Sequence, residues 1–381
     1  MKIYGNNHLC YCFNVFDEAN ANPSSEQFTK RINSIRNATA KDLEKDFGLG
    51  LWLNHENLKR LSSSSTTASF KETLKKTGLY VFTVNAFPYS TFHGRTVKAD
   101  VYMPDWRSEE RLEYSMAVAD LLAQLLPDGL DGSISTVPGG YKTYIKKNDF
   151  AEISKNILKM NQHLMSIYKD TGKKIRLAIE FEPDCIWEDT EEFIDFKQKY
   201  LSALDVLENF IGICYDCSHA EVIGADIETD IQKLKKANTA TAKIQISAAL
   251  SSPFPEAKTI LAKFAEDTYL HQTTVLRDGK IIKRYRDLKD LLSEDTNSIN
   301  LISHYHLPIF FESSGDGLIK AKKDNILKLA KLLRDAKLKD SHLEIETYTY
   351  SVLPQDVFDG SVEKMIEKEY AYFLKIIHPP T

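Results

Sequence analysis

The sequence predicts an α/β fold, a (β/α)8 barrel formed by one domain over residues 1–381. Short apolar runs of four to eight residues alternate with longer amphipathic segments along the whole chain, and there are eight such runs. Several runs are apolar at almost every position, for example residues 79–84, as expected for parallel strands buried on both faces. An open doubly wound sheet is the alternative, but no Gly-x-Gly-x-x-Gly motif follows the first run.

The expected strands and helices follow one another in the order that a parallel barrel requires. The eight expected strands are residues 9–15, 48–53, 79–85, 133–137, 175–180, 211–216, 242–247 and 342–346. The expected helices are residues 25–36, 108–126, 150–168, 190–209, 227–238, 322–333 and 361–377. Ser108 precedes the acidic Glu110, and we expect it to cap the second of these helices.

Two segments interrupt this alternation. Residues 62–67, with the sequence SSSSTT, are expected to form a surface connection between two helical pieces. Residues 250–300 form a long insertion after the seventh strand, and insertions of this length are often lids or small accessory elements. We expect this insertion near the barrel mouth, with residues 299–306 returning to the mouth as a further strand.

Composition excludes several classes of protein. The net charge is −5 and basic residues form no stripe, so we expect no nucleic-acid partner. No apolar stretch approaches the ~20 residues of a membrane helix, and the first residues do not resemble a secretory signal, so direct membrane insertion is not expected. The five cysteines are few and odd in number, which favours reduced thiols in a cytoplasmic protein.

Three carboxylates stand at the ends of expected strands. Glu180, Asp216 and Glu346 end the fifth, sixth and eighth strands, and chemistry in such barrels gathers at the carboxyl ends of strands. Carboxylates held close together repel one another unless a cation, a proton or a cationic substrate lies between them. A single strand-end acid is more often paired with a nearby Lys or Arg. Three together indicate a site for a divalent metal, Mg²⁺ or Mn²⁺, or Zn²⁺ if a histidine joins them.

The motifs around these acids resemble those of the xylose isomerase-like TIM barrels, which include sugar epimerases and the endonuclease IV group. GICYDCSH (212–219) is similar to their Asp-x-x-His motif on strand six, and LAIE and EIETY resemble their glutamate-bearing strands five and eight. The resemblance implies that Glu180, Asp216 and Glu346 bind the metal. It also implies that His219 faces the ligand.

The chain departs from the catalytic relatives on strand seven. Gln245 stands where sugar epimerases have a metal-binding histidine, and its amide oxygen could bind Mg²⁺ or Mn²⁺ more weakly. His304 or His306 could supply a replacement nitrogen ligand. The histidines of the endonuclease type are also absent, with Asn85 and Val137 near their positions, which argues against a three-metal phosphodiesterase centre.

Longer segments resemble the EboE family of metabolite traffic proteins within the same superfamily. The similar segments are residues 79–94, 101–112, 132–142, 178–185, 243–250, 269–272, 304–308 and 342–354, which together cover nearly the whole chain. This resemblance implies the handling of a small-molecule precursor together with partner proteins of a pathway. It implies no known reaction.

The remaining candidate substrate contacts are polar residues close to strand ends. They are Asn85, His93, Lys142, Glu182, His304, His306 and Tyr348. His304 and His306 are two residues apart, so in a strand both point to one face. The alternative for the two histidines is a polar strand end bonded to backbone. For His93 and Lys142 the alternative is an ordinary turn, because prolines and glycines surround them.

Two functions fit these observations, and a third has less support. The first is a metal-dependent isomerase or epimerase acting on a sugar-like or polyhydroxylated metabolite, with Glu180 and Glu346 as acid and base. The second is a carrier that holds such a metabolite without turning it over, which the substitution at Gln245 favours. Phosphoester hydrolysis is the third.

Overall fold

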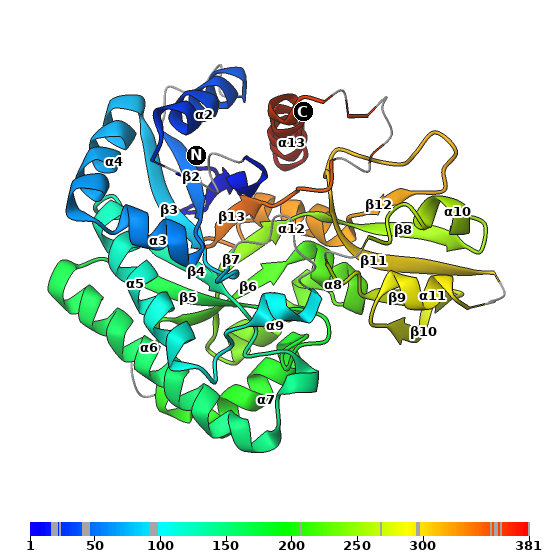
Figure 1. Cartoon of the computed structure of the whole chain (residues 1–381), viewed down its shortest axis with the longest axis horizontal. Helices are drawn as coiled ribbons and strands as arrows, with labels where there is room; N and C mark the ends of the chain where they lie inside the picture. The colour runs from blue at the N-terminus through cyan, green and yellow to red at the C-terminus, as the bar shows by residue number, and fades with distance from the viewer. Residues whose placement is uncertain are drawn as a thin grey trace.

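Eight parallel strands form a barrel in the computed structural model (Figure 1). The strands are β1 (His8–Tyr11), β2 (Phe47–Trp52), β3 (Leu79–Asn85), β4 (Gly132–Thr136), β5 (Ile175–Glu180), β6 (Ile211–Asp216), β7 (Ala240–Ile246) and β13 (His342–Ile345). Their order is β1-β13-β7-β6-β5-β4-β3-β2, and a parallel bridge from Cys12 to Gly50 joins the two edges. The predicted (β/α)8 barrel is confirmed.

The structure describes residues 1–16, 22, 24–39, 46–90, 98–205, 208–266, 269–294, 298–350, 353, 357–358 and 360–379. His93 lies outside these residues. Within them, no helix is long and apolar enough to cross a membrane. The described cysteines are all unpaired and buried.

Helices surround the barrel, as Figure 1 shows. They are α2 (Glu26–Thr39), α3 (His55–Leu61), α4 (Ser64–Thr77), α5 (Glu109–Leu125), α6 (Phe150–Thr171), α7 (Thr190–Tyr200), α8 (Cys217–Ile223), α9 (Ile227–Lys236), α12 (Asp324–Arg334) and α13 (Val362–Ile377). Short 3-10 helices cover Phe13–Val15, Lys98–Tyr102, Lys142–Tyr144, Lys147–Asp149 and Ser202–Asp205. Ser108 caps α5 by accepting from the backbone N–H of Glu110, as predicted.

The expected surface connection at residues 62–67 is wrong, because most of it is helical. Helix α4 begins at Ser64, and the Ser63 side chain caps it by accepting from the backbone N–H of Thr66. Thr67 is buried, and its hydroxyl donates to the carbonyl oxygens of Leu61 and Ser63. Serine and threonine favour helix starts as well as turns, so the same residues serve as a cap.

The barrel interior is unusually polar below its mouth. The Lys243 ammonium lies 2.5 Å from the Glu344 carboxylate, and both side chains are fully buried. Lys243 also donates to Ser135 Oγ at 3.1 Å. A Cβ at Gly50 would come within 2.2 Å of the Glu344 carboxylate, so β2 needs a glycine at this position. The interior therefore holds charge directly beneath the strand ends.

The chain between β7 and α12 forms a second, antiparallel sheet beside the barrel (Figure 1). Its strands are β8 (Ala248–Phe254), β9 (Thr273–Arg277), β10 (Lys280–Tyr285), β11 (Ile299–Leu307) and β12 (Lys320–Lys322), in the order β10-β9-β11-β8-β12. Helices α10 (Lys258–Leu261) and α11 (Leu288–Leu292) belong to the same segment. This sheet begins before residue 250 and ends beyond residue 300.

Strand β11 carries an irregularity that matters for the site. Ser303 pairs with Leu250 of β8 and Leu307 pairs with Ala248, so four steps along β11 match two steps along β8. Extra residues in one strand bend it and redirect its side chains. The redirected residues include His304 and His306.

Candidate functional site

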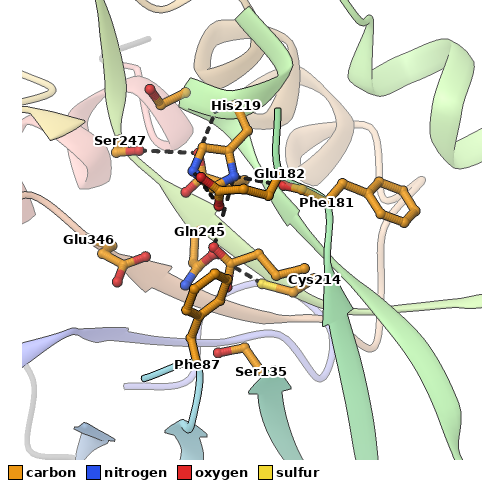
Figure 2. Close-up of polar contacts among 12 residues, drawn as sticks. Phe87, Ser135, Phe181, Glu182, Cys214, His219, Gln245, Ser247 and Glu346 are labelled. Carbon is orange, nitrogen blue, oxygen red and sulfur yellow. Dashed lines mark hydrogen bonds and ion pairs between the residues drawn. The ribbon is translucent and has the colours of Figure 1, made fainter. Parts of the chain in front are cut away.

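The three strand-end acids meet at the mouth of the barrel. Glu180 ends β5, Asp216 ends β6, and Glu346 follows β13 directly, with its backbone N–H bonded to the carbonyl of Ile246. Each side chain is almost completely buried. Figure 2 shows Glu346, Gln245, Glu182 and His219 gathered around one space.

Hydrogen bonds hold Asp216 and Glu346, and one oxygen of Glu180 and one of Asp216 lack a partner among the described residues. Asp216 Oδ1 caps α8 by accepting from the backbone N–H of His219 at 2.9 Å, and Ser247 Oγ donates to it at 3.5 Å. Asn85 Nδ2 donates to Glu346 Oε1 at 2.9 Å. Glu180 Oε2 and Asp216 Oδ2 are buried and have no hydrogen-bond partner among the described residues. Such orphaned buried oxygens need an explanation, and a bound cation is one.

Burial and mutual repulsion raise the pKa values of the acids. Burial, followed by the charges of Glu346 and Asp216, raises the pKa of Glu180 well above its ordinary value. Glu346 shifts in the same direction because of burial and the charges of Glu344 and Asp216. Burial also raises the pKa of Glu182 to about 7, although the nearby His219 opposes this shift. A divalent cation bound between the carboxylates would offset the repulsion among their negative charges.

The donor atoms fit a divalent metal. Ligand atoms of Glu180, Asp216 and His219 lie within 4.8 Å of one another, and so do those of Asp216, His306 and Glu346. Carboxylate oxygens suit Mg²⁺ and Mn²⁺, and added imidazole nitrogens suit Mn²⁺ and Zn²⁺. The structure thus brings His306, from the second sheet, to the acids of the barrel.

Gln245 occupies the mouth but directs its amide away from this role. It is fully buried and lies opposite Asp216 in the register of β6 and β7. Its Oε1 accepts from Cys214 Sγ at 3.2 Å, and its Nε2 has no partner among the described residues. Ligation by the Gln245 oxygen therefore requires the amide to turn over, and its assignment as a metal ligand stays a prediction.

The remaining predicted contacts lie at different distances from the site. A pocket of about 470 Å³ opens over the acids, and Asn85, Glu182, His304, His306 and Tyr348 line it together with Glu180, His219 and Glu346. Lys142 does not line it. Its ammonium binds Glu188 and Glu192, each at 2.9 Å, so its charge is already neutralised at the surface.

Several lining residues were not singled out from the sequence. They are mostly aromatic or belong to loops and to the second sheet: Trp52, Phe87, Tyr102, Tyr269 and His271. Tyr102 donates to Glu182 Oε1 at 3.1 Å, and Gln272 Nε2 lies 3.4 Å from the Tyr102 hydroxyl. Apolar residues ending β2 or flanking the mouth look like ordinary core in a sequence, so only the position of Trp52 at the end of a strand could have indicated it.

We expect the metal-free protein to lose stability as the pH rises from about 6.5 to about 8, because below this range the lowered pKa values of the buried His304 and His306 act in the opposite direction. Raised pKa values mean that the folded protein holds more protons than the unfolded chain, so stability falls with pH. Glu182 alone, with its pKa raised to about 7, contributes a loss of about 3 kcal/mol once the pH passes that value. The Asp216 and Glu182 charges outweigh burial and raise the pKa of His219, which acts in the same direction.

Urea denaturation at several pH values, with EDTA and with Mn²⁺, measures this slope. Mn²⁺ is expected to flatten it, because the metal binds the deprotonated acids. A metal-free protein whose stability rises across this range would contradict the assignment of buried, mutually repelling acids.

The chain is similar in structure to solved proteins at low sequence identity. D-psicose 3-epimerase from Clostridium cellulolyticum H10, solved with D-tagatose, is 11% identical over 97% of this chain and 98% of its own, with a TM-score of 0.52. A xylose isomerase domain protein from Alicyclobacillus acidocaldarius gives the same identity, coverage and TM-score. A xylose isomerase-like TIM barrel protein from Mycobacterium smegmatis in complex with magnesium is 11% identical, covering 92% and 88%, with a TM-score of 0.50.

No protein-family model and no curated protein matches the sequence. At these identities the similarity concerns the fold. The chain therefore has the fold of the xylose isomerase-like TIM barrel proteins.

Proposed function

We propose that the protein is a metal-dependent epimerase or isomerase that acts on a sugar-like, polyhydroxylated carbonyl compound. The observation that carries this proposal is the set of buried carboxylates, Glu180, Asp216 and Glu346, with two oxygens that lack partners. Glu180, Asp216 and Glu346 would hold a divalent ion, with Gln245 joining them if its amide turns over. The ion would polarise the carbonyl and hydroxyl oxygens of the substrate.

Glu180 and Glu346 are the residues proposed to move protons on two sides of a substrate. They line the pocket from β5 and from the end of β13, which are separated in the barrel by β6 and β7. Burial and the neighbouring charges raise the pKa values of both glutamates, so each accepts a proton more readily than an ordinary glutamate does. One glutamate would remove the proton from the carbon next to the carbonyl, and the other would return a proton to the opposite face.

The walls of the pocket favour a ring-shaped or chain-like polyol. Trp52, Phe87, Tyr102 and Tyr348 give apolar surfaces for the C–H faces of such a ligand, while Asn85, Glu182 and His219 give polar contacts. One solved protein with the same fold is a D-psicose 3-epimerase crystallised with D-tagatose, and another holds magnesium. Both agree with a polyol substrate and a hard cation.

Solvent deuterium exchange tests this function. The protein loaded with Mn²⁺ is incubated in D₂O with D-tagatose and D-psicose as probes, and mass spectrometry follows deuterium incorporation and epimer formation. Exchange of Glu180 or Glu346 for Gln is expected to lower the rate at least ~100-fold, the usual contribution of a general acid or base. Glu192→Gln, which alters a surface ion pair with Lys142, is the matched control and should leave the rate unchanged.

A carrier of the same kind of metabolite is the second candidate, and the amide of Gln245 is the observation that favours it. Its oxygen accepts from Cys214, so in this orientation of the amide strand β7 supplies no metal ligand. We also propose, from the motifs alone, an EboE-like metabolite traffic role in the cytoplasm alongside pathway proteins. Binding of the probes without any deuterium exchange would overturn the enzyme and leave the carrier.

A further inference from the structure

Three histidine rings converge beside the acid cluster. His219 is the third residue of the short helix α8, whereas His304 and His306 lie on the bulged part of β11 in the second sheet. The Nε2 atom of His304 lies 3.0 Å from that of His219 and 3.1 Å from that of His306. All three rings line the pocket, and His219 and His306 are almost completely buried.

The opposite ring nitrogens determine which atom carries the hydrogen in two of these rings. His219 Nδ1 lies 2.7 Å from the carbonyl oxygen of Phe181, and His306 Nδ1 lies 3.0 Å from that of Glu346. A carbonyl oxygen only accepts, so each Nδ1 must donate its N–H. In the neutral rings, the Nε2 atoms of His219 and His306 therefore carry no hydrogen and present a lone pair.

The third ring is fixed in the same way through Gln272. His304 Nδ1 lies 2.8 Å from Gln272 Oε1. The amide orientation is set because Gln272 Nε2 donates to the carbonyl oxygen of Pro183 at 3.1 Å, leaving the amide oxygen to face His304. His304 must then donate from Nδ1, and its Nε2 also presents a lone pair.

With all three rings neutral, the Nε2 lone pair of His304 faces those of His219 and His306 at 3.0 and 3.1 Å with no hydrogen between them. A proton on His219, whose pKa the Asp216 and Glu182 charges raise against burial, would relieve only the first of these contacts. Such contacts repel unless an electrophile lies among the nitrogens. The arrangement also reproduces how metal-binding histidines are held, with the other ring N–H donated to a carbonyl or amide oxygen. Tetrahedral Zn²⁺ with Zn–N bonds of ~2.0–2.1 Å needs ligand nitrogens ~3.3 Å apart, close to the separations seen here.

We propose that His219, His304 and His306 bind a second metal ion, a nitrogen-preferring transition metal such as Zn²⁺, next to the ion held by the carboxylates. Glu182 is its nearest acid, with Oε2 3.4 Å from His219 Nε2, and Tyr102 holds the other oxygen of this carboxylate. Asp216, 3.9 Å from His219 Nε2, lies between the two groups of ligands.

The second site goes beyond the reaction proposed above, although it shares the pocket and His219 with it. Imidazole nitrogens favour Zn²⁺ and its neighbours, whereas the carboxylates favour Mg²⁺ or Mn²⁺, so the two sites differ in preference. His304 reaches the pocket with about 12% of its side chain exposed, so the ion would face whatever the pocket holds. The second sheet would then contribute directly to the metal site, because its strand β11 provides two of the three ligands.

Metal stoichiometry and Zn K-edge absorption test the proposal without an activity assay. The protein is stripped with a chelator, then incubated with excess Mn²⁺ and one equivalent of Zn²⁺ per chain. We expect one Zn²⁺ per chain, with about three nitrogen ligands at ~2.0–2.1 Å. Exchange of His304 for Ala is expected to weaken Zn²⁺ binding at least ~100-fold, because loss of a direct ligand costs more than the 10–100-fold usual for residues that only hydrogen-bond to a ligand. Binding of Mn²⁺ should remain intact.

His271→Ala is the matched control. His271 lies just before strand β9, and its Nδ1 and Nε2 face the His304 carbonyl and Glu266, so Zn²⁺ binding should remain. Glu346→Gln should remove Mn²⁺ and keep Zn²⁺, which separates failure of this proposal from failure of the carboxylate site. A wild-type absorption spectrum with only oxygen ligands, or unchanged Zn²⁺ affinity in folded His304→Ala, would overturn the second site. If His304→Ala does not fold, the wild-type spectrum alone decides.

Discussion

Replacing Asp216 with asparagine is expected to abolish metal binding by the carboxylates and, at the same time, to stabilise the metal-free protein. Asparagine keeps the oxygen that caps α8 at the backbone N–H of His219, so the local fold is retained. The substitution removes one buried negative charge. In the wild type this charge of Asp216 raises the pKa values of both Glu180 and Glu346. The two effects have opposite signs because the proposed cation would be bound by the same charges that repel one another without it.

We expect the affinity for Mn²⁺ to fall at least ~100-fold, since a direct ligand is lost and outer partners alone account for 10–100-fold. In EDTA, the free energy of unfolding should rise by about 1–2 kcal/mol, the cost of one unsatisfied buried polar group. With Mn²⁺ at 100 times the wild-type dissociation constant, the wild type gains about 2.7 kcal/mol and the variant gains little. Isothermal titration and urea denaturation measure these quantities.

The control is Asp226→Asn. Asp226 caps α9 by accepting from the backbone N–H of Thr229, as Asp216 caps α8, but it lies at the surface and pairs with Lys328. It should leave Mn²⁺ binding unchanged. Equal Mn²⁺ affinity in Asp216→Asn and wild type would contradict the metal site, and a less stable metal-free variant would contradict the repulsion among the acids.

Replacing Lys243 with methionine should destabilise the protein by about 3–5 kcal/mol, the usual cost of removing one partner of a buried ion pair. Lys243 and Glu344 are fully buried within the barrel, and the variant would leave the Glu344 carboxylate there without its cation. Although burial lowers the pKa of Lys243, the Glu344 charge outweighs it and raises the pKa above its usual value. The ammonium is therefore charged in the folded protein.

The double variant Lys243→Met with Glu344→Met is expected to recover most of the lost stability, because no uncompensated charge remains. Lys197→Met is the matched control. Lys197 is also buried, but its partner Asp205 is about half exposed and can be hydrated, so the loss should be smaller. Urea denaturation compares the four proteins. A loss below about 1 kcal/mol for Lys243→Met would mean that the buried Glu344 carboxylate does not depend on Lys243 to compensate its charge.

Lys243 also connects the barrel interior to the mouth. Its charge lowers the pKa values of Glu180 and Glu346, against the larger effects of burial and of the neighbouring acids. In Lys243→Met these glutamates should hold their protons to higher pH, and Mn²⁺ binding at neutral pH should weaken in consequence.

The barrel could be predicted from sequence because its strands are short apolar runs separated by longer amphipathic segments. The strands at residues 79–85, 175–180 and 211–216 have the predicted bounds. The acids at the mouth could be placed for the same reason, since parallel strands in a barrel end on one side. The first strand is shorter than predicted, ending at Tyr11, because the chain turns into a 3-10 helix at Phe13.

The second sheet could not be built from the sequence pattern in the same way. Strand β8 contains small residues and Pro253, and it follows β7 after a single residue, so no turn separates the two in the sequence. One signal was present: Asp278 and Gly279 both have positive φ and link β9 to β10 in the manner of a two-residue hairpin turn. The approach of His304 and His306 to His219 depends on the bulge in β11, which alternation alone does not predict.

Anomalous diffraction from crystals soaked in Mn²⁺ tests the central claim most directly, namely that the mouth of this barrel is a metal centre. We predict a Mn²⁺ peak bounded by the carboxylates of Glu180, Asp216 and Glu346, with the orphaned oxygens Glu180 Oε2 and Asp216 Oδ2 turned toward it. Crystals that diffract well and show no anomalous peak in reach of these three carboxylates would contradict the account.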